Sequence, residues 1–279
     1  MPINTTRSWA RVIDDYEDVP EFYREPFAAF SVACADPPYA VFAPPDRAFG
    51  RKQNPRIICA AEDEIRIYEK YRKQLSCTVF PIRGIQFIET GSILLYSWIT
   101  ISGVTEDTLT SVTWTYNTST EPVFKPVIDR ARQRGTHIDT DTAGFETLLP
   151  LGYKYLNMAK SAVSASDAVR QVITQPEIKA PRLSFFGRTF YRTLAPSGVI
   201  ILTARELILL SVNADRGLKA GGTQRFIPIS KIRGVSITPI GEGLARCTLH
   251  LPQGECVQIG LEYAKTDALS TTLKALRPA

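Results

Sequence analysis

The sequence contains an internal repeat, and this feature limits the possible folds more than any other. Residues 81–88 and 228–235 share the pattern P-I-x-x-I-x-x-[IV]. Two apolar runs precede the pattern in each copy, at residues 56–61 and 65–68 and again at 199–203 and 207–210. Both copies end in a helical pattern that closes on an arginine, and the features keep their order at offsets of 142–147 residues. We infer two copies of one folding unit, and a chain of 279 residues is long enough for each to bury its own core.

Each copy is dominated by strand patterns, which are short segments rich in β-branched and aromatic residues between polar or glycine-bearing turns. In one of them Val112, Trp114 and Tyr116 alternate with polar residues, as a half-buried antiparallel strand requires. The predicted strands are residues 57–61, 65–69, 75–80, 85–89, 93–102 and 109–116, then 199–203, 207–212, 224–228, 235–238, 244–251 and 256–261. A hairpin turn is predicted at residues 252–254.

Helical patterns follow the strands of each copy. Apolar residues recur at i, i+3, i+4 and i+7 from Phe124, and Leu269, Leu273 and Leu276 repeat this spacing at the end of the second copy. Further helices are predicted at residues 153–173, between the copies, and around residues 9–16. The predicted fold class is therefore α+β and mainly β.

Composition places the chain among globular proteins. Hydrophobic residues make up 44% and charged residues 22%, which excludes a disordered, collagenous or coiled-coil chain. The 5 cysteines are scattered and form no CxxC pair, so neither a disulfide framework nor a zinc ribbon fits. No apolar stretch is long enough to span a bilayer. We expect a cytoplasmic protein without a transmembrane segment.

The net charge of +5 is concentrated at one end of the chain. Residues 1–135 and 136–175 each carry a net charge of −1, whereas residues 176–279 hold 14 basic and 7 acidic side chains. Such an excess of positive charge attracts anions in general, so the sign alone admits nucleic acid, acidic lipid surfaces and acidic proteins as partners.

The strand and helix patterns together resemble the pleckstrin-homology superfold, in which two antiparallel sheets form a partly open barrel and a C-terminal helix closes one end. The strand pair at 57–69, the P-I-x-x-I-x-x-[IV] strand entry, the run 98–103 and the Asn117-Thr-Ser turn are similar to those of bacterial PH-like domains. In the second copy, residues 246–250 replace the tryptophan-bearing strand of the first. The resemblance implies a tandem protein with a helical preface at 1–37, PH-like domains at 38–134 and 181–279, and a helix-containing linker at 135–180.

The resemblance also points to candidate binding residues, since eukaryotic members bind phosphoinositide headgroups with basic residues around the loop that joins the first two strands. In the first copy this loop carries Arg47, Arg51, Lys52 and Arg56. The corresponding stretch of the second copy has Arg188 and Arg192 among the aromatic residues Phe185, Phe186, Phe190 and Tyr191. A further basic group comprises Arg216, Lys219, Arg225, Lys231 and Arg233. Guanidinium groups can pair with phosphate or carboxylate oxygens, although such residues also commonly solvate loops.

Signals for an enzyme are poor. His137 lies in the run His-Ile-Asp-Thr-Asp, and His250 lies between Cys247 and Cys256, so either could contribute to a metal site. Cys247 and His250 differ by three positions, which on a regular strand places them on opposite faces. The sequence contains neither a G-x-S-x-G elbow nor a G-x-x-x-x-G-K-[ST] phosphate loop. We therefore expect no catalytic residue, no metal and no cofactor.

The expected function is that of a non-catalytic binding or assembly module, which recognises an anionic lipid surface or a protein partner. The alternative is a small metal-dependent or hydrolytic enzyme with a site near His137 or His250. Nucleic acid is disfavoured as a partner, and we expect a monomer or a dimer. Trp98, Trp114 and residues 94–96 are assigned to the core. If the basic excess is functional, reversing the charges of Arg216, Lys219 and Arg225 should abolish binding.

Overall fold

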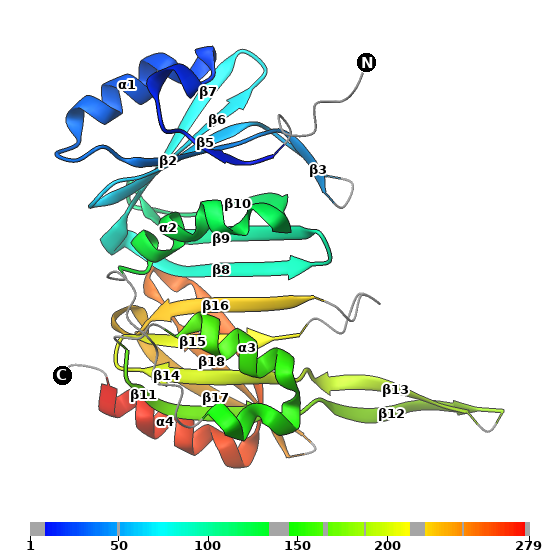
Figure 1. Cartoon of the computed structure of the whole chain (residues 1–279). Coiled ribbons are helices and arrows are strands. Elements are labelled where there is room, and N and C mark those ends of the chain that lie inside the picture. The colour runs from blue at the N-terminus through cyan, green and yellow to red at the C-terminus, as the bar shows by residue number, and fades with distance from the viewer. Residues whose placement is uncertain are drawn as a thin grey trace. The chain divides into compact units, whose positions relative to one another are not determined.

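The computed structural model describes residues 9–48, 51–133, 145–163, 167–186, 188–212, 221–241 and 243–276. The chain divides into two compact units, Met1–Gly135 and Thr136–Ala279 (Figure 1). The fold is α+β and mainly β, as predicted, and the strands that pair within each unit are antiparallel. Among the described residues the sheets stay open, with no closed barrel.

The strands of the first unit form two groups, one of five strands and one of three. The strand order of the five is β1-β2-β5-β6-β7 and that of the three is β10-β9-β8. The elements are β1 (Arg11–Val12), α1 (Arg24–Ala33), β2 (Tyr39–Ala43), β3 (Asp46–Ala48), β4 (Arg51–Gln53), β5 (Arg56–Ala60), β6 (Glu64–Tyr71), β7 (Gln74–Pro81), β8 (Ile85–Ile93), β9 (Tyr96–Thr105), β10 (Thr108–Asn117) and α2 (Glu121–Ala131). Strands β3 and β4 form a hairpin inserted between β2 and β5.

The second unit repeats this order of elements. Strands β16, β15, β14 and β11 pair in that order, and β17, β18 and β19 form a separate sheet. The elements are α3 (Tyr153–Ala162), β11 (Val169–Gln175), β12 (Ile178–Phe185), β13 (Arg188–Ala195), β14 (Gly198–Thr203), β15 (Glu206–Ser211), β16 (Gly222–Pro228), β17 (Gly234–Gly241), β18 (Leu244–His250), β19 (Cys256–Glu262) and α4 (Tyr263–Leu276). A hairpin again follows the first strand of the unit, here β12 and β13.

The repeated P-I-x-x-I motif forms the same turn in both units. Its proline has φ −56° and ψ 133° in the first unit and φ −58° and ψ 132° in the second, and a 3-10 helix follows, Ile82–Gly84 or Ile229–Lys231. The first isoleucine donates its backbone N–H to the carbonyl of Asp63 (2.7 Å) or Arg205 (2.8 Å), and both isoleucines of each motif are buried. The proline fixes φ, and the two isoleucines fill the core where the chain passes from one sheet to the next.

The central strands β2, β5 and β14 are buried at nearly every position, which explains why they are nearly continuously apolar. In the first unit α1 covers one face, and the aromatic core formed there includes Tyr23, Phe27, Phe30, Phe42, Ile57, Cys59 and Tyr68. Helix α2 contacts β2, β5 and β8, with Phe124 packed against Trp114 and Tyr116 at ring-centroid distances of 6.2 and 4.5 Å. In the second unit α3 contacts β15, and α4 contacts β11 and β17 to β19.

The twelve strands predicted inside the two copies are all present, with ends that differ by a few residues. One helix prediction was right only in its first part, and another was wrong. The helix predicted over 153–173 ends at Ala162, and residues 169–175 form β11, because Ile173 and its neighbours pair with β14. The first strand of the second unit therefore lies inside the segment predicted as a linker. Near the N-terminus Arg11 and Val12 pair with β2 instead of forming a helix, and the helix of this region is α1.

The prediction that residues 94–96 belong to the core was also wrong, whereas Trp114 is fully buried as expected. Leu94 and Leu95 are 66% and 67% exposed, because they form the turn between β8 and β9 and not part of a strand. Thr118 fixes this turn by donating its backbone N–H to the carbonyl of Leu95 and its hydroxyl to that of Leu94. No helix of the described residues is both long and apolar enough to cross a membrane.

Candidate functional site

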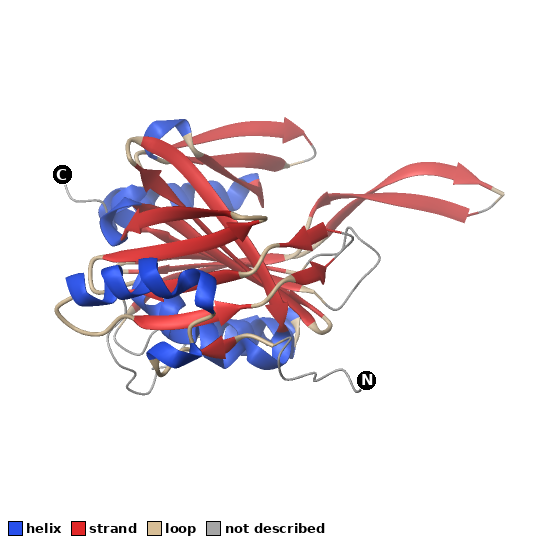
Figure 2. Ribbon diagram, turned by 90° about the horizontal axis from the view of Figure 1, so that it is seen from above, coloured by secondary structure: helices blue, strands red, loops and turns tan. Residues whose placement is uncertain are grey.

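Strands β12 and β13 form a two-stranded ribbon, the arm (residues 178–195), which extends beyond the sheet of the second unit (Figures 1 and 2). The arm continues the pairing of β11 with β14, whose last pair is Gln175 and Gly198. Its own register runs from Ile178 opposite Ala195 to Phe185 opposite Arg188. Eight residues per strand correspond to about 26 Å at a rise of about 3.3 Å per residue.

The base of the arm is fixed to the rest of its unit. Gln175 is 2% exposed, its Nε2 donates to the carbonyl of Pro176 (2.9 Å), and its Oε1 accepts the backbone N–H of Glu262 on β19 (2.8 Å). Ala195, at the end of β13, is fully buried and packs near Gly260 of β19. The arm therefore has a defined direction at its base, whatever it contacts at its tip.

The outer part of the arm exposes large aromatic side chains. Phe186, at the turn, is 91% exposed, and Phe185, Phe190 and Tyr191 are 57–62% exposed. The rings of Phe185 and Phe186 lie edge to face with their centroids 4.5 Å apart. An isolated two-stranded ribbon is marginally stable in water, and monomeric proteins rarely expose clustered aromatic residues. This combination makes the outer part of the arm the candidate site.

All the charges of the arm are positive. Lys179, Arg182, Arg188 and Arg192 lie among its 18 residues, which contain no aspartate or glutamate, so four of the seven excess positive charges of residues 176–279 lie here. Lys179 forms an ion pair with Glu177 at the base (2.8 Å). The three arginines are exposed, and within the described part of the chain their side chains form no hydrogen bond or ion pair. Arg188, Phe190 and Arg192 alternate along β13, which places them on one face.

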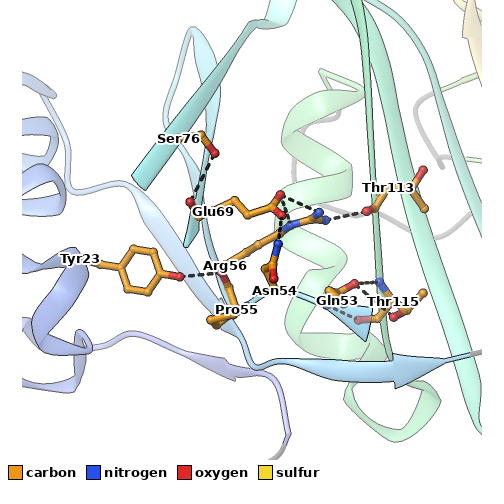
Figure 3. Close-up of polar contacts among 9 residues, drawn as sticks. All are labelled: Tyr23, Gln53, Asn54, Pro55, Arg56, Glu69, Ser76, Thr113 and Thr115. Atoms are coloured by element: carbon orange, nitrogen blue, oxygen red, sulfur yellow. Dashed lines mark hydrogen bonds and ion pairs between the residues drawn. The ribbon is translucent and has the colours of Figure 1, made fainter. Parts of the chain in front are cut away.

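The hairpin of β3 and β4 occupies the equivalent place in the first unit. Arg47, Arg51 and Lys52 lie on its strands, with Arg47 opposite Lys52. Its base is tied to β10, because Gln53 donates to the carbonyl of Thr115 (3.1 Å) and accepts the backbone N–H of Thr115 (2.6 Å) (Figure 3). In both units the predicted basic loop is thus a hairpin between the first two core strands.

Arg56 makes contacts inside the first unit. Its Nε and Nη2 donate to Oε2 of Glu69 on β6 (2.9 and 2.7 Å), and its Nη1 donates to the carbonyl of Thr113 on β10 (2.6 Å) (Figure 3). The second carboxylate oxygen of Glu69 accepts a hydrogen bond from Nδ2 of Asn54 (2.7 Å). The side chain of Arg56 is 12% exposed, so its charge is balanced by Glu69 and its donors join three strands.

A buried tyrosine supports the same region. The hydroxyl of Tyr23 donates to the carbonyl of Pro55 (2.6 Å), and burial raises the pKa of Tyr23 to about 12 (Figure 3). The segment between β4 and β5 is therefore held on both sides, by Tyr23 from the helical preface and by Arg56 from β5.

The second predicted basic group is only partly described. Arg216 and Lys219 lie outside the described residues. Arg225 lies on β16 opposite Leu209 and is half-buried. Burial lowers the pKa of Lys231, and the nearby Arg233 lowers it further.

The two histidines differ in what the structure describes. His137 lies outside the described residues, whereas His250 is exposed on β18 and contacts Ser236 and Cys256. Cys247 is fully buried, which confirms that it and His250 lie on opposite faces of the strand. Among the described residues no three His, Cys, Asp or Glu side chains are arranged to hold a metal ion.

Comparison of the chain with protein-family models and with curated protein sequences finds no match. Sequence reasoning singled out the arm's aromatic residues and two of its arginines, and it missed Arg182 and the buried anchor Gln175. The absence of acidic residues from 178–195 was the available signal for Arg182. Nothing in the sequence indicates that Gln175 reaches β19, because Glu262 lies 87 residues further along the chain.

Proposed function

We propose that the chain is a non-catalytic binding module built from two PH-like units, and that the arm of the second unit recognises an anionic lipid surface. The order of four core strands, three strands and a helix in each unit supports the PH-like description. The observation that carries the function is the arm itself, where three arginines without a partner among the described residues lie beside four exposed aromatic rings.

The composition of the arm favours a lipid surface over nucleic acid. Adenine and cytosine edges are read mainly by side-chain amides and carboxylates, and the arm contains no Asn, Gln, Asp or Glu. Two adjacent phenylalanines at its turn have no polar group to offer a base, but they suit the boundary between headgroups and acyl chains. The arginines lie further from the tip, where they can pair with the phosphate groups of an anionic bilayer.

The two-stranded structure of the arm limits how deeply it can enter a bilayer. A two-stranded ribbon has open edges, and unpaired backbone N–H and C=O groups are not tolerated in the hydrocarbon core. Only the tip therefore inserts, to a depth of about 5–10 Å. Arg188 lies directly opposite Phe185, at the first strand pair behind the turn, so it lies at the depth of the headgroups when the turn inserts. Each arginine near the surface contributes about 1 kcal/mol, so three together change the affinity roughly 100-fold.

The test uses the full chain with vesicles of phosphatidylcholine alone or mixed with phosphatidylglycerol. The wild-type protein should sediment with the anionic vesicles, and raising the salt concentration should release it, since surface charges are screened within about 8 Å at physiological salt. The triple variant Arg182→Glu, Arg188→Glu and Arg192→Glu should lose binding. The pair Phe185→Ser and Phe186→Ser should weaken binding while keeping its dependence on salt.

A matched control reverses three exposed basic residues outside the arm, Lys160, Arg170 and Lys274, and so changes the net charge equally. This variant should bind as the wild type does, because its arm is intact. Equal losses in both triple variants would contradict a role for the arm. Binding to heparin that depends on the arm, without binding to vesicles, would instead favour a soluble polyanion, such as an acidic protein or nucleic acid, as the partner.

A further inference from the structure

Three side chains form a row across the exposed face of the sheet of β17, β18 and β19. His250 lies directly opposite Cys256 on one neighbouring strand and directly opposite Gly234 on the other. Nδ1 of its ring lies 3.6 Å from Sγ of Cys256, and Nε2 lies 2.8 Å from Oγ of Ser236. Directly opposed residues of antiparallel strands share a face, so the strand register brings the imidazole and the thiol together.

The absence of a side chain at Gly234 leaves room for the ring in this place. A Cβ atom on Gly234 would lie 3.7 Å from Cδ2 of His250, so the ring passes over a residue without a side chain on its way to Ser236. Ser236 is two residues further along β17 and therefore lies on the same face. A longer side chain at position 234 would compete with the ring for this path.

The hydrogen-bond chemistry of the row suits proton transfer. When Nε2 of a neutral imidazole donates to Oγ of Ser236, Nδ1 is free to accept the thiol proton of Cys256. After the transfer the imidazolium donates from both nitrogens, to the thiolate on one side and to the hydroxyl on the other. The charged residues on this face of the three strands are Arg246 and Glu262, which lie about 13 and 20 Å away along the strands. Sγ of Cys256 also lies 3.6 Å from the carbonyl oxygen of Gly254, which accepts a hydrogen bond from the thiol but does not take its proton. His250 is thus the base beside Cys256.

The other four cysteines are in different surroundings. Cys59 and Cys247 are fully buried, and burial raises the pKa of Cys247 to about 11 and that of Cys59 further. Burial also raises the pKa values of Cys34 and Cys77. Because the thiolate is the reactive form, these four thiols should react slowly at neutral pH. Cys77 is exposed, which makes it a control within the same chain.

We propose that Cys256 is a nucleophilic thiol deprotonated by His250, and that it is a site of modification by a low-molecular-weight disulfide. The thiolate attacks one sulfur of the disulfide, a new bond forms between Cys256 and that sulfur, and the disulfide bond breaks. The leaving thiolate takes up the proton held by the imidazolium. The disulfide is itself the oxidant, so no other co-reactant is needed. This proposal does not depend on the function of the arm.

The test measures the rate at which each cysteine of the full chain reacts with oxidised glutathione and with iodoacetamide, with the modified residue located by mass spectrometry. At about pH 7 Cys256 should react at least about tenfold faster than Cys77. His250→Ala and His250→Gln should slow Cys256 about tenfold, and Ser236→Ala should slow it less. At about pH 10 the wild type and the His250 variants should react at similar rates, because the thiol then ionises without help.

Each outcome decides the proposal. Equal rates for Cys256 and Cys77 at about pH 7, or an unchanged rate in both His250 variants, would overturn it. Variants that stay slow at about pH 10 would show that the ring shapes access to the thiol and does not accept its proton, which also overturns it. Far-UV circular dichroism of the His250 variants should match that of the wild type, since the residue is exposed.

Discussion

At the scale of a single residue, Arg56 shows how a positively charged side chain can connect strands inside a folded unit. Its guanidinium pairs with Glu69 through two nitrogens and reaches the backbone of Thr113 with a third. An arginine can do this because its donors form a planar fork. With 12% of the side chain exposed, loss of the arginine would leave the Glu69 carboxylate and the Thr113 carbonyl without these donors in a poorly solvated place.

The first prediction concerns this contact. Arg56→Ala should lower the free energy of unfolding by about 2–3 kcal/mol, because it removes several charge-assisted hydrogen bonds and leaves a half-buried carboxylate. Arg56→Lys should cost less, since it keeps the charge but loses the fork. Urea unfolding followed by circular dichroism measures both effects.

The matched control for Arg56→Ala is Lys125→Ala, which removes one partner of an exposed ion pair on α2. It should change stability by less than about 0.5 kcal/mol. If both variants lose the same stability, the contacts of Arg56 add nothing beyond an ordinary surface pair.

At the scale of an element, the turn formed by the repeated motif is the best evidence that the two units are built alike. Proline and isoleucine recur at the same places, the φ and ψ angles of the two prolines agree within two degrees, and each turn donates a hydrogen bond to the turn between the preceding strands. Ile82 and Ile229 are 6% and 3% exposed. Equal burial at equivalent places predicts equal energetic roles.

Ile82→Ala and Ile229→Ala should therefore each lower the free energy of unfolding by about 2–4 kcal/mol, through lost burial and the cavity that remains. Ser230→Ala, at an exposed position of the second turn, should change it by less than about 0.5 kcal/mol. Urea midpoints of the three variants check the prediction. A cost for Ile229→Ala as small as that of the serine variant would mean that the second turn does not share the role of the first.

At the scale of the whole molecule, the sequence predicts the elements better than it predicts what they contact. Strands such as β5 and β14 are predictable because β-branched residues dominate them, and α2 because its apolar spacing is regular. Strand β11 was missed because Val169 and Ile173 also fit the helical spacing that begins at Tyr153. Only pairing with β14 decides between the two, and that pairing partner lies about 30 residues further along the chain.

The candidate site shows the same limit. The aromatic and basic residues of the arm are visible in the sequence, but their exposure on a paired ribbon is not, because neither face of the arm is buried against a core. The contact of Arg56 with Glu69 spans 13 residues, and that of Gln175 with Glu262 spans 87. Local patterns carry no information on such contacts, so Arg56 appeared as one more loop cation.

Buried tyrosines in both units make the whole molecule sensitive to alkali. Burial raises the pKa values of Tyr23 (to about 12) and Tyr116 in the first unit and of Tyr155 in the second. A tyrosine in an unfolded chain ionises near pH 10. Because the folded pKa is the higher one, the stability associated with the protonated hydroxyl is complete below about pH 10 and is lost as the pH rises toward the folded pKa.

We therefore expect stability to fall between about pH 10 and pH 12, with phenolate absorbance of the buried tyrosines appearing together with the loss of strand signal. Tyr23→Phe separates this effect from ordinary packing. At about pH 7 the variant should be less stable than the wild type by about 1 kcal/mol, since it lacks the hydrogen bond to Pro55. Above about pH 10 the wild type must release a proton on unfolding and the variant does not, so the difference should shrink and then reverse in sign. A difference that stays constant across this range would show that the ionisation of Tyr23 is not linked to unfolding.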